Sequence, residues 1–74
     1  MNLADSHFEE FDQRFQEMLG RLTPECRTVL VMHDLEGHKS KSIAKKLQLP
    51  LETVRHRLHR ARRELRDLLQ QEAE

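Results

Sequence analysis

Arginine and histidine side chains gather in residues 51–66, and this stretch holds most of the groups in the chain that could do chemistry. It carries six arginines and two histidines: Arg55, His56, Arg57, His59, Arg60, Arg62, Arg63 and Arg66. Guanidinium groups bind phosphate, and they can pair with the O6 and N7 atoms of guanine in the major groove of DNA. The stretch therefore indicates a polyanionic partner, with DNA as the first candidate.

Charge is strongly segregated along the chain, although the formal net charge is zero. Residues 1–36 carry three basic and eight acidic side chains, a net charge of −5. Residues 37–66 carry ten basic and two acidic side chains, a net charge of +8, and residues 67–74 add three acids. A concentrated basic block favours a polyanionic partner. The alternative interpretation is a solvated, arginine-rich helix surface.

Enzymatic and metal chemistry find little support in the sequence. It contains no glycine-rich phosphate loop, no nucleophile–base pair and no converging pair of acids. Cys26 has no histidine or second cysteine at catalytic spacing, so we expect an inert thiol. His56 and His59 make half of a metal site at best, because ligand sets normally need three or four members. We therefore predict no enzyme, no metal and no cofactor.

Size and composition favour one small, all-α domain without strands. The chain has 74 residues, 35% of them charged, with three Phe and no Trp or Tyr. Its uncharged runs are far shorter than the roughly 20 residues of a membrane span. The N-terminus is acidic where a signal peptide would be basic. The single Cys26 excludes an internal disulfide, so we predict a cytoplasmic protein without a membrane partner.

An amphipathic helix is predicted for the N-terminal part, residues 1–22. Residues 6–9 have the S-x-x-E form of a capping box, so a helix should begin there. An apolar stripe follows at steps of three and four residues, formed by Phe8, Phe11, Phe15, Met18 and Leu22. We expect this stripe to pack on the rest of the domain. The alternative is that it docks on another region of a longer protein or on a partner.

Residues 23–74 are predicted to complete the same structural unit, beginning with a helix from Pro24 to about Leu35. Thr23 is a candidate N-cap, and proline suits the first helical position. Gly37 is well placed for the left-handed residue after the helix end. One face of this helix should be buried, and it carries Cys26, Val29, Leu30 and His33.

A helix-turn-helix is predicted next. The pattern indicates a short helix from about Ser40 to Leu47, a turn at residues 48–50, and a long helix from about Leu51 towards Gln71. The short helix should direct apolar residues inward and lysines outward: Ile43, Ala44 and Leu47 against Lys41, Lys45 and Lys46.

The long helix has two chemically different sides. Its buried stripe is predicted to consist of Val54, Leu58, Ala61 and Leu65, prolonged by Leu68 and Leu69. The opposite side carries Glu52, His56, His59, Arg60 and Arg63, with Arg55 and Arg66 at its edge. The helix should therefore hold the core with one side and present basic groups with the other.

These segments together resemble region 4 of the sigma-70 family, and within it the extracytoplasmic-function (ECF) group. The resemblance covers about Leu19 to Leu69 and lies in LTPECRTVL from Leu22, LEG from Leu35, IAxxL from Ile43, and TVRHRLHRAR from Thr53. It implies a small four-helix domain with a C-terminal helix-turn-helix, winged-helix-like or of the sigma region 4 type. It also implies recognition of the promoter −35 element, with residues 51–66 as the recognition helix, and contact with the β-flap of the RNA polymerase core. Many members of the family are clamped by an anti-sigma factor.

The resemblance implies roles for individual residues. The residues expected to read base edges are Glu52, Arg55, His56, His59 and Arg60. The residues expected to contact phosphate are Lys39, Lys41, Lys45, Thr53, Arg63 and Arg66.

Four positions depart from the family pattern. Lys39 and Ser42 stand where the family usually has the Ser and Glu of a capping box. Gln48 replaces a turn glycine, which implies a costlier backbone. Glu52 stands where the family often has glycine. A carboxylate at this position repels phosphate but can accept a hydrogen bond from N4 of cytosine. These changes affect the expected DNA sequence more than the fold.

Two other functions are compatible with the sequence. One is a protein-interaction module, bound by an anti-sigma factor or by polymerase, that binds DNA only weakly. The other is the helix-turn-helix of a LuxR-type regulator, although the RAR segment after Leu58 favours sigma. No segment resembles region 2 of a sigma factor, so we expect a fragment of a longer sigma factor or a stand-alone regulator.

Overall fold

The computed structural model describes residues 13–73, which form helices and no strand. The elements are a helix at residues 13–20, α2 (Pro24–Leu30) continued by the π-helical turn η1 (Val31–Leu35), α3 (Ser40–Leu47) and α4 (Leu51–Ala73). This confirms the predicted all-α, four-helix fold for the described residues. The expected capping box at residues 6–9, with Phe8 and Phe11, lies outside them. No helix among residues 13–73 is long and apolar enough to cross a membrane.

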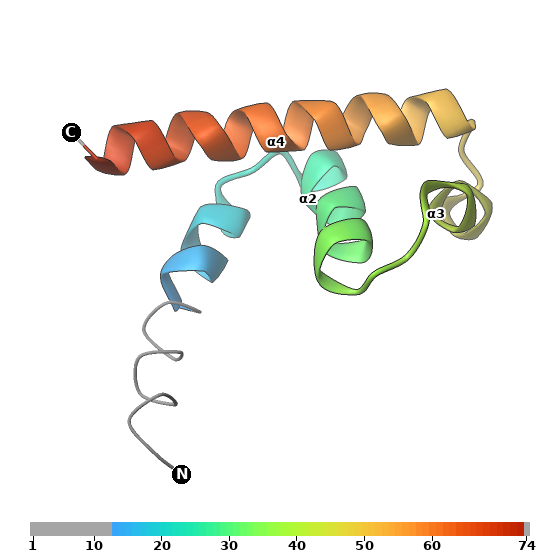
Figure 1. The fold of residues 1–74 in the computed structure, drawn as a ribbon, viewed down its shortest axis with the longest axis horizontal. Coiled ribbons are helices and arrows are strands. Elements are labelled where there is room, and N and C mark those ends of the chain that lie inside the picture. Colours follow the sequence, from blue (N-terminus) through green and yellow to red (C-terminus); the bar gives the residue numbers. More distant parts are fainter. Residues whose placement is uncertain (1–12, 74) are drawn as a thin grey trace, which may run out of the picture.

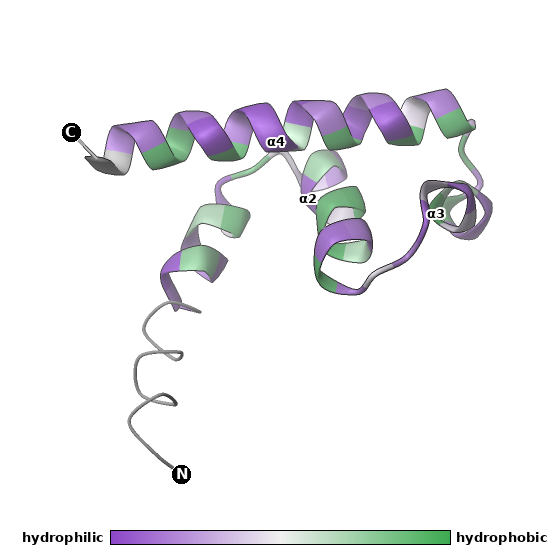
Figure 2. Ribbon diagram, in the orientation of Figure 1, coloured by the Kyte–Doolittle hydropathy of each residue, from purple (hydrophilic) through white to green (hydrophobic). Residues whose placement is uncertain are grey.

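Helix α4 is the spine of the molecule. It has 23 residues and so a length of about 34 Å. Figure 1 shows the helix of residues 13–20, α2 and α3 all on one side of α4, with α2 between the other two. The molecule is correspondingly flat, with extents of 42 × 32 × 14 Å. In Figure 2 the hydrophobic residues of α4 face its neighbours and the hydrophilic ones face outward.

Two apolar clusters attach the other helices to α4. The first holds the helix of residues 13–20 and α2 against the second half of α4; its buried members are Leu19, Leu22, Cys26, Leu30 and Ala61. The second holds α2 and α3 against the first half of α4; its buried members are Val29, Ile43, Val54 and Leu58. The predicted buried stripe of α4 is thus divided between the two clusters.

The helix-turn-helix has the predicted bounds. Helix α3 runs from Ser40 to Leu47 and α4 begins at Leu51. Gln48 adopts the left-handed conformation, with φ of 57°, in order to end α3. A side chain in this conformation is strained because its Cβ crowds the backbone. Gly37, at φ of 79°, confirms the predicted left-handed residue before α3.

The π-helical turn corrects the prediction for the end of the second helix. Helical structure extends to Leu35, as predicted, but the Glu36 amide donates to the Val31 carbonyl at 2.9 Å, five residues back. This wider winding rotates the later side chains relative to a regular α-helix. His33, predicted on the buried face, is therefore half-buried and bonds to Asp34, and Leu35 is exposed.

The apolar stripe of α4 is shorter than predicted. Leu65 and Leu68 pack against the first cluster as expected. Leu69, predicted to prolong the stripe, is 49% exposed. It follows Leu68 by one residue, and adjacent residues on a helix point about 100° apart. The single covered edge at this end of α4 accommodates only one of them.

Candidate nucleic-acid interface

One exposed face of α4 carries all five residues expected to read bases. Glu52, Arg55, His56, His59 and Arg60 are exposed. They project from the same helix whose other side buries Val54, Leu58 and Ala61. The packing of that buried stripe fixes the rotation of α4 about its axis, so the exposed face has a defined direction.

Most of the residues expected to contact phosphate are exposed as well. Arg63 and Arg66 are exposed on the later turns of α4. Lys41 and Lys45 are exposed on α3, and Lys39 is exposed at the N-cap position of that helix. Thr53, in the first turn of α4, is half-buried. Lys39 makes no side-chain capping bond, in agreement with the lost capping box.

Four basic side chains of this face make no ion pair with any side chain that the structure describes. They are His56, His59, Arg63 and Arg66. Their positive or potentially positive groups are therefore available to an external anion. Arg63 and Arg66 are permanently charged, because a guanidinium does not lose its proton in proteins.

Arg55 is held by the acid on its own helix. Its Nη1 atom donates to Oε1 of Glu52 at 3.0 Å, one turn back, and both side chains are largely exposed. At the beginning of α4 this face therefore contains an ion pair between an acid and one of its arginines.

Three other arginines of residues 51–66 lie near acids, which belong to α2 for Arg57, to α4 itself for Arg60 and to η1 for Arg62. Arg57 lies 3.9 Å from Glu25 (Nη2 to Oε2) and is only 27% exposed. Arg60 lies 3.7 Å from Glu64 (Nε to Oε2), one turn further along α4. Sequence composition does not distinguish these arginines from the unpaired ones.

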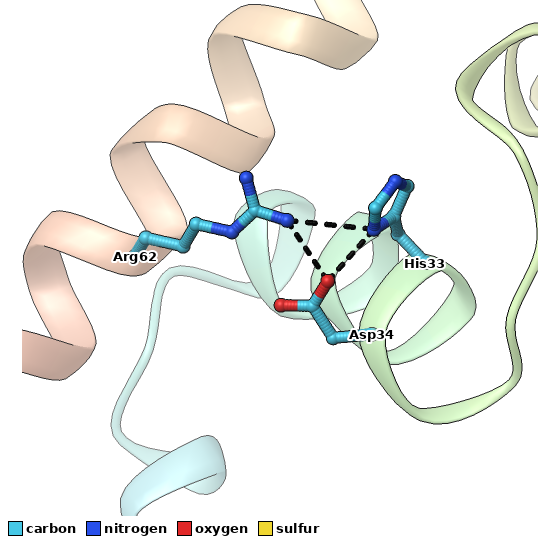
Figure 3. Close-up of polar contacts among 3 residues, drawn as sticks. All are labelled: His33, Asp34 and Arg62. Atoms are coloured by element: carbon cyan, nitrogen blue, oxygen red, sulfur yellow. Dashed lines mark hydrogen bonds and ion pairs between the residues drawn. The ribbon is translucent and has the colours of Figure 1, made fainter.

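Arg62 joins α4 to the π-helical turn (Figure 3). Its Nη2 atom donates to Oδ1 of Asp34 at 2.9 Å, and Nδ1 of His33 lies 2.7 Å from the same oxygen. The hydrogen bond from Arg62, aided by that from His33, lowers the pKa of Asp34 below its ordinary value, although partial burial opposes the shift. Arg62 thus has a partner within the fold, unlike its neighbour Arg63.

Glu64 fixes the start of α2 and was not recognised in the sequence. It accepts a hydrogen bond from the Thr23 amide at 3.0 Å through Oε1, and one from the Thr23 hydroxyl at 2.9 Å through Oε2. The hydrogen bond from the Thr23 amide is the main cause of the lowered pKa of Glu64. The Thr23 hydroxyl and Arg60 lower this pKa further, whereas burial opposes the shift.

The position of Thr23 as the N-cap was predicted correctly, but its side chain makes no cap bond. The Thr23 hydroxyl donates instead to Glu64, 41 residues away in the sequence. Glu64 is one of only two acids in residues 37–66, but nothing in the sequence indicates Thr23 as its partner.

Comparison with known proteins identifies this arrangement. The family described as Sigma-70, region 4 matches residues 12–65, which is most of the chain. The chain belongs to the sigma-70 region 4 family. A curated relative, the ECF RNA polymerase sigma factor SigE of Mycolicibacterium smegmatis, is 40% identical over 63 residues. That match covers 85% of this chain and 24% of the relative, so the chain spans about a quarter of the relative's length.

The thiol and the candidate metal ligands of this region 4 domain form no reactive site among residues 13–73. Burial, with a smaller contribution from Glu64, raises the pKa of the Cys26 thiol, which is 1% exposed and therefore protected from reagents. Within residues 13–73 there is no group of three His, Cys, Asp or Glu side chains that could hold a metal ion.

A hollow of about 320 Å³ lies beside the interface, between α2 and the helix-turn-helix. Its lining mixes apolar side chains with one acid and one arginine: Pro24, Glu25, Thr28, Leu47, Leu49 and Arg57. The first three come from α2, Leu47 is the last residue of α3, and Leu49 lies in the turn that follows. Arg57 is the one residue of α4 in this lining, and the unpaired basic side chains of α4 take no part in it.

Proposed function

We propose that this region 4 domain binds duplex promoter DNA at the −35 element and thereby supports transcription initiation. The observation that carries the proposal is the face of α4 on which His56, His59, Arg63 and Arg66 are exposed and unpaired. The first turns of a recognition helix reach deepest into the major groove, and residues further along meet the backbone. On this basis Glu52, Arg55, His56, His59 and Arg60 read bases, and Arg63 and Arg66 contact phosphate.

Lysines of the first helix of the motif complete the phosphate contacts in this proposal. Lys41 and Lys45 project from α3, and Lys39 precedes it. Thr53 contributes a hydroxyl at the front of α4. The side chains of α3 that pack inward, Ile43 and Leu47, hold these cations at a fixed position relative to α4.

A salt titration tests this proposal. Binding of the chain to duplex DNA should show log K falling against log salt with a slope of about −4 to −5, if roughly five phosphates are neutralised. Arg66→Met should make the slope less steep by about one, whereas Arg21→Met, at an exposed position after the helix of residues 13–20, should not. Affinity independent of salt would contradict DNA binding and favour a protein-interaction module.

The hollow beside the interface supports a second role, as a protein contact. We propose that it accepts the β-flap of RNA polymerase, and that an anti-sigma factor competes with polymerase or DNA for this domain. Thr28→Arg, at an exposed position in the wall of the hollow, should weaken binding to a β-flap fragment and leave DNA affinity within twofold. Unchanged flap binding in this variant would contradict the assignment.

We also propose that the N-terminal helix forms one structural unit with residues 23–74. The first cluster supports this, because Leu19 and Leu22 are buried against Cys26 and Ala61. Removal of residues 1–22 should therefore lower the unfolding midpoint in urea. A truncated chain as stable as the complete one would make residues 1–22 a separate unit. As a sigma domain the protein would act in the bacterial cytoplasm, on the nucleoid.

A further inference from the structure

Within residues 51–66, Glu52 is the acid that is mostly exposed on the proposed DNA face. It lies in the first turn of α4, with 82% of its side chain exposed, and its partner Arg55 is 60% exposed. The other acid of residues 51–66, Glu64, points towards Thr23 instead. Glu52 therefore faces the same direction as the cations.

A carboxylate at this position reduces attraction to every duplex, whatever its sequence. It lies among groups that would approach phosphates, and like charges at a few ångströms repel. Pairing with Arg55 offsets part of this repulsion. The gain from an acid here must come from base edges, and the exocyclic N4 amino group of cytosine is the donor that Glu accepts from in the major groove.

The hydrogen bonds of the pair leave capacity for bases on both partners. Arg55 uses one donor of Nη1, on Oε1 of Glu52, out of the five donors of a guanidinium. Oε2 of Glu52 has no partner among the described residues. One carboxylate oxygen and the rest of the guanidinium fork can therefore act at the same time.

We propose that Glu52 and Arg55 form a single specificity-determining unit that reads two base pairs of the DNA site. Oε2 of Glu52 accepts from N4 of a cytosine, and Arg55 donates to O6 and N7 of a guanine. The bond at 3.0 Å also holds the Arg55 fork in position, so Glu52 acts on both contacts. This inference rests on the proposed DNA-binding function and deepens it.

Selection of binding sites from random duplexes by the complete 74-residue chain tests the Glu52 contact. The unchanged protein should select cytosine at one position. Glu52→Ala should reduce the preference for cytosine by about tenfold and increase affinity for unrelated DNA. Glu52→Gln should shift the preference at that position towards adenine, because a glutamine amide pairs with N6 and N7 of adenine. The control is Glu17→Gln, which removes one charge from an exposed position on the helix of residues 13–20 and should alter no base preference.

A double-variant cycle tests whether the two residues act as a unit. Arg55→Lys keeps the charge but loses the planar fork, so it should reduce the preference for guanine at one position. If Glu52 positions Arg55, Glu52→Ala should weaken that same guanine preference, and the two effects should not add in the double variant. Additive effects, or a Glu52→Ala profile identical to that of the unchanged protein, would overturn this inference. If the unchanged protein selects no sequence at all, the proposed promoter recognition fails instead.

Discussion

Glu64 illustrates how a residue inside a basic segment can serve the fold rather than the ligand. Its carboxylate accepts hydrogen bonds from both the backbone amide and the hydroxyl of Thr23, and it lies beside Arg60. The amide of Thr23 precedes α2, where backbone donors have no partner within the helix. A single acid on α4 therefore satisfies the beginning of α2 across the interior of the domain.

Replacement of Glu64 by glutamine should destabilise the domain by about 1–2 kcal/mol. Hydrogen bonds to a charged acceptor are stronger than neutral ones, and the Glu64 side chain is only 27% exposed. Urea unfolding followed by far-UV circular dichroism measures the change. Glu17→Gln makes an equal change of charge at an exposed site. It should shift the free energy of unfolding by less than about 0.5 kcal/mol, as is usual for surface substitutions. Equal effects of the two variants would contradict a specific role of Glu64.

At the scale of single elements, two neighbouring arginines of α4 have different partners. Arg62 bonds to Asp34 of the π-helical turn, whereas Arg63 makes no ion pair with a described side chain. Composition gives both residues the same expected role. Helical periodicity placed Arg63 on the exposed side of α4, but the partner of Arg62 depends on the position of η1 beside α4.

Arg62→Met and Arg63→Met should therefore have opposite signatures. Arg63→Met should make the salt dependence of DNA binding less steep by about one phosphate and leave stability unchanged. Arg62→Met should leave the salt slope unchanged and lower stability by less than about 1 kcal/mol, since the pair is half exposed and screened. Salt titrations and urea unfolding of both variants measure this. A change of slope in Arg62→Met equal to that in Arg63→Met would show that the ion pair opens when DNA binds.

The connection between α3 and α4 contains a strained residue that a glycine would relieve. The left-handed conformation of Gln48 costs a residue with a Cβ about 1–2 kcal/mol, and glycine avoids this strain. Glycine also makes the unfolded chain more flexible, which offsets part of the gain, so Gln48→Gly should stabilise the domain by about 0.5–1 kcal/mol. Gln48→Ala retains a Cβ and should not stabilise. Thermal unfolding of the two variants measures the difference. Equal melting temperatures would show that the turn is not strained.

The sequence predicted these elements well where the pattern is local. Pro24 marks the beginning of α2, Gly37 the turn before α3 and Pro50 the turn before α4, and apolar spacing identified Val54, Leu58 and Ala61 as buried. The π-helical turn could not be predicted, because one extra residue in a turn leaves no compositional mark. The Thr23–Glu64 bond joins residues 41 positions apart, and neither residue type indicates the other. The exposed face of α4 follows from periodicity, but the partners of Arg57, Arg60 and Arg62 depend on where α2 and η1 lie.

For the molecule as a whole, two carboxyl groups link the α2–η1 segment to α4. Asp34 bonds to Arg62, and Glu64 bonds to Thr23. In both, hydrogen bonding makes the pKa lower in the folded protein than in the unfolded chain. The folded state therefore binds fewer protons than the unfolded chain as these groups titrate.

Acid should consequently destabilise the domain. The two carboxylates contribute fully to the free energy of unfolding above their ordinary pKa values of about 4. This stabilisation is lost as the pH falls through their lower pKa values in the folded protein. The free energy of unfolding, measured in urea from pH 7 to pH 2.5, should decline mainly below about pH 4.5. The double variant Asp34→Asn, Glu64→Gln should be less stable at neutral pH and should show a shallower decline. A parallel decline in both proteins would assign the acid sensitivity to other groups.

The uninterrupted α4 determines how this domain meets a ligand. The same helix is anchored at Val54 and Leu58 near its beginning and at Ala61 further along, so its two halves have no hinge between them. The backbone of the basic face is already ordered when the chain folds. Binding a ligand therefore carries no further entropy cost for ordering that backbone. Under the proposed function, encounter with a duplex should require only the ordering of long side chains, and diffusion and the attraction between opposite charges should govern the association rate.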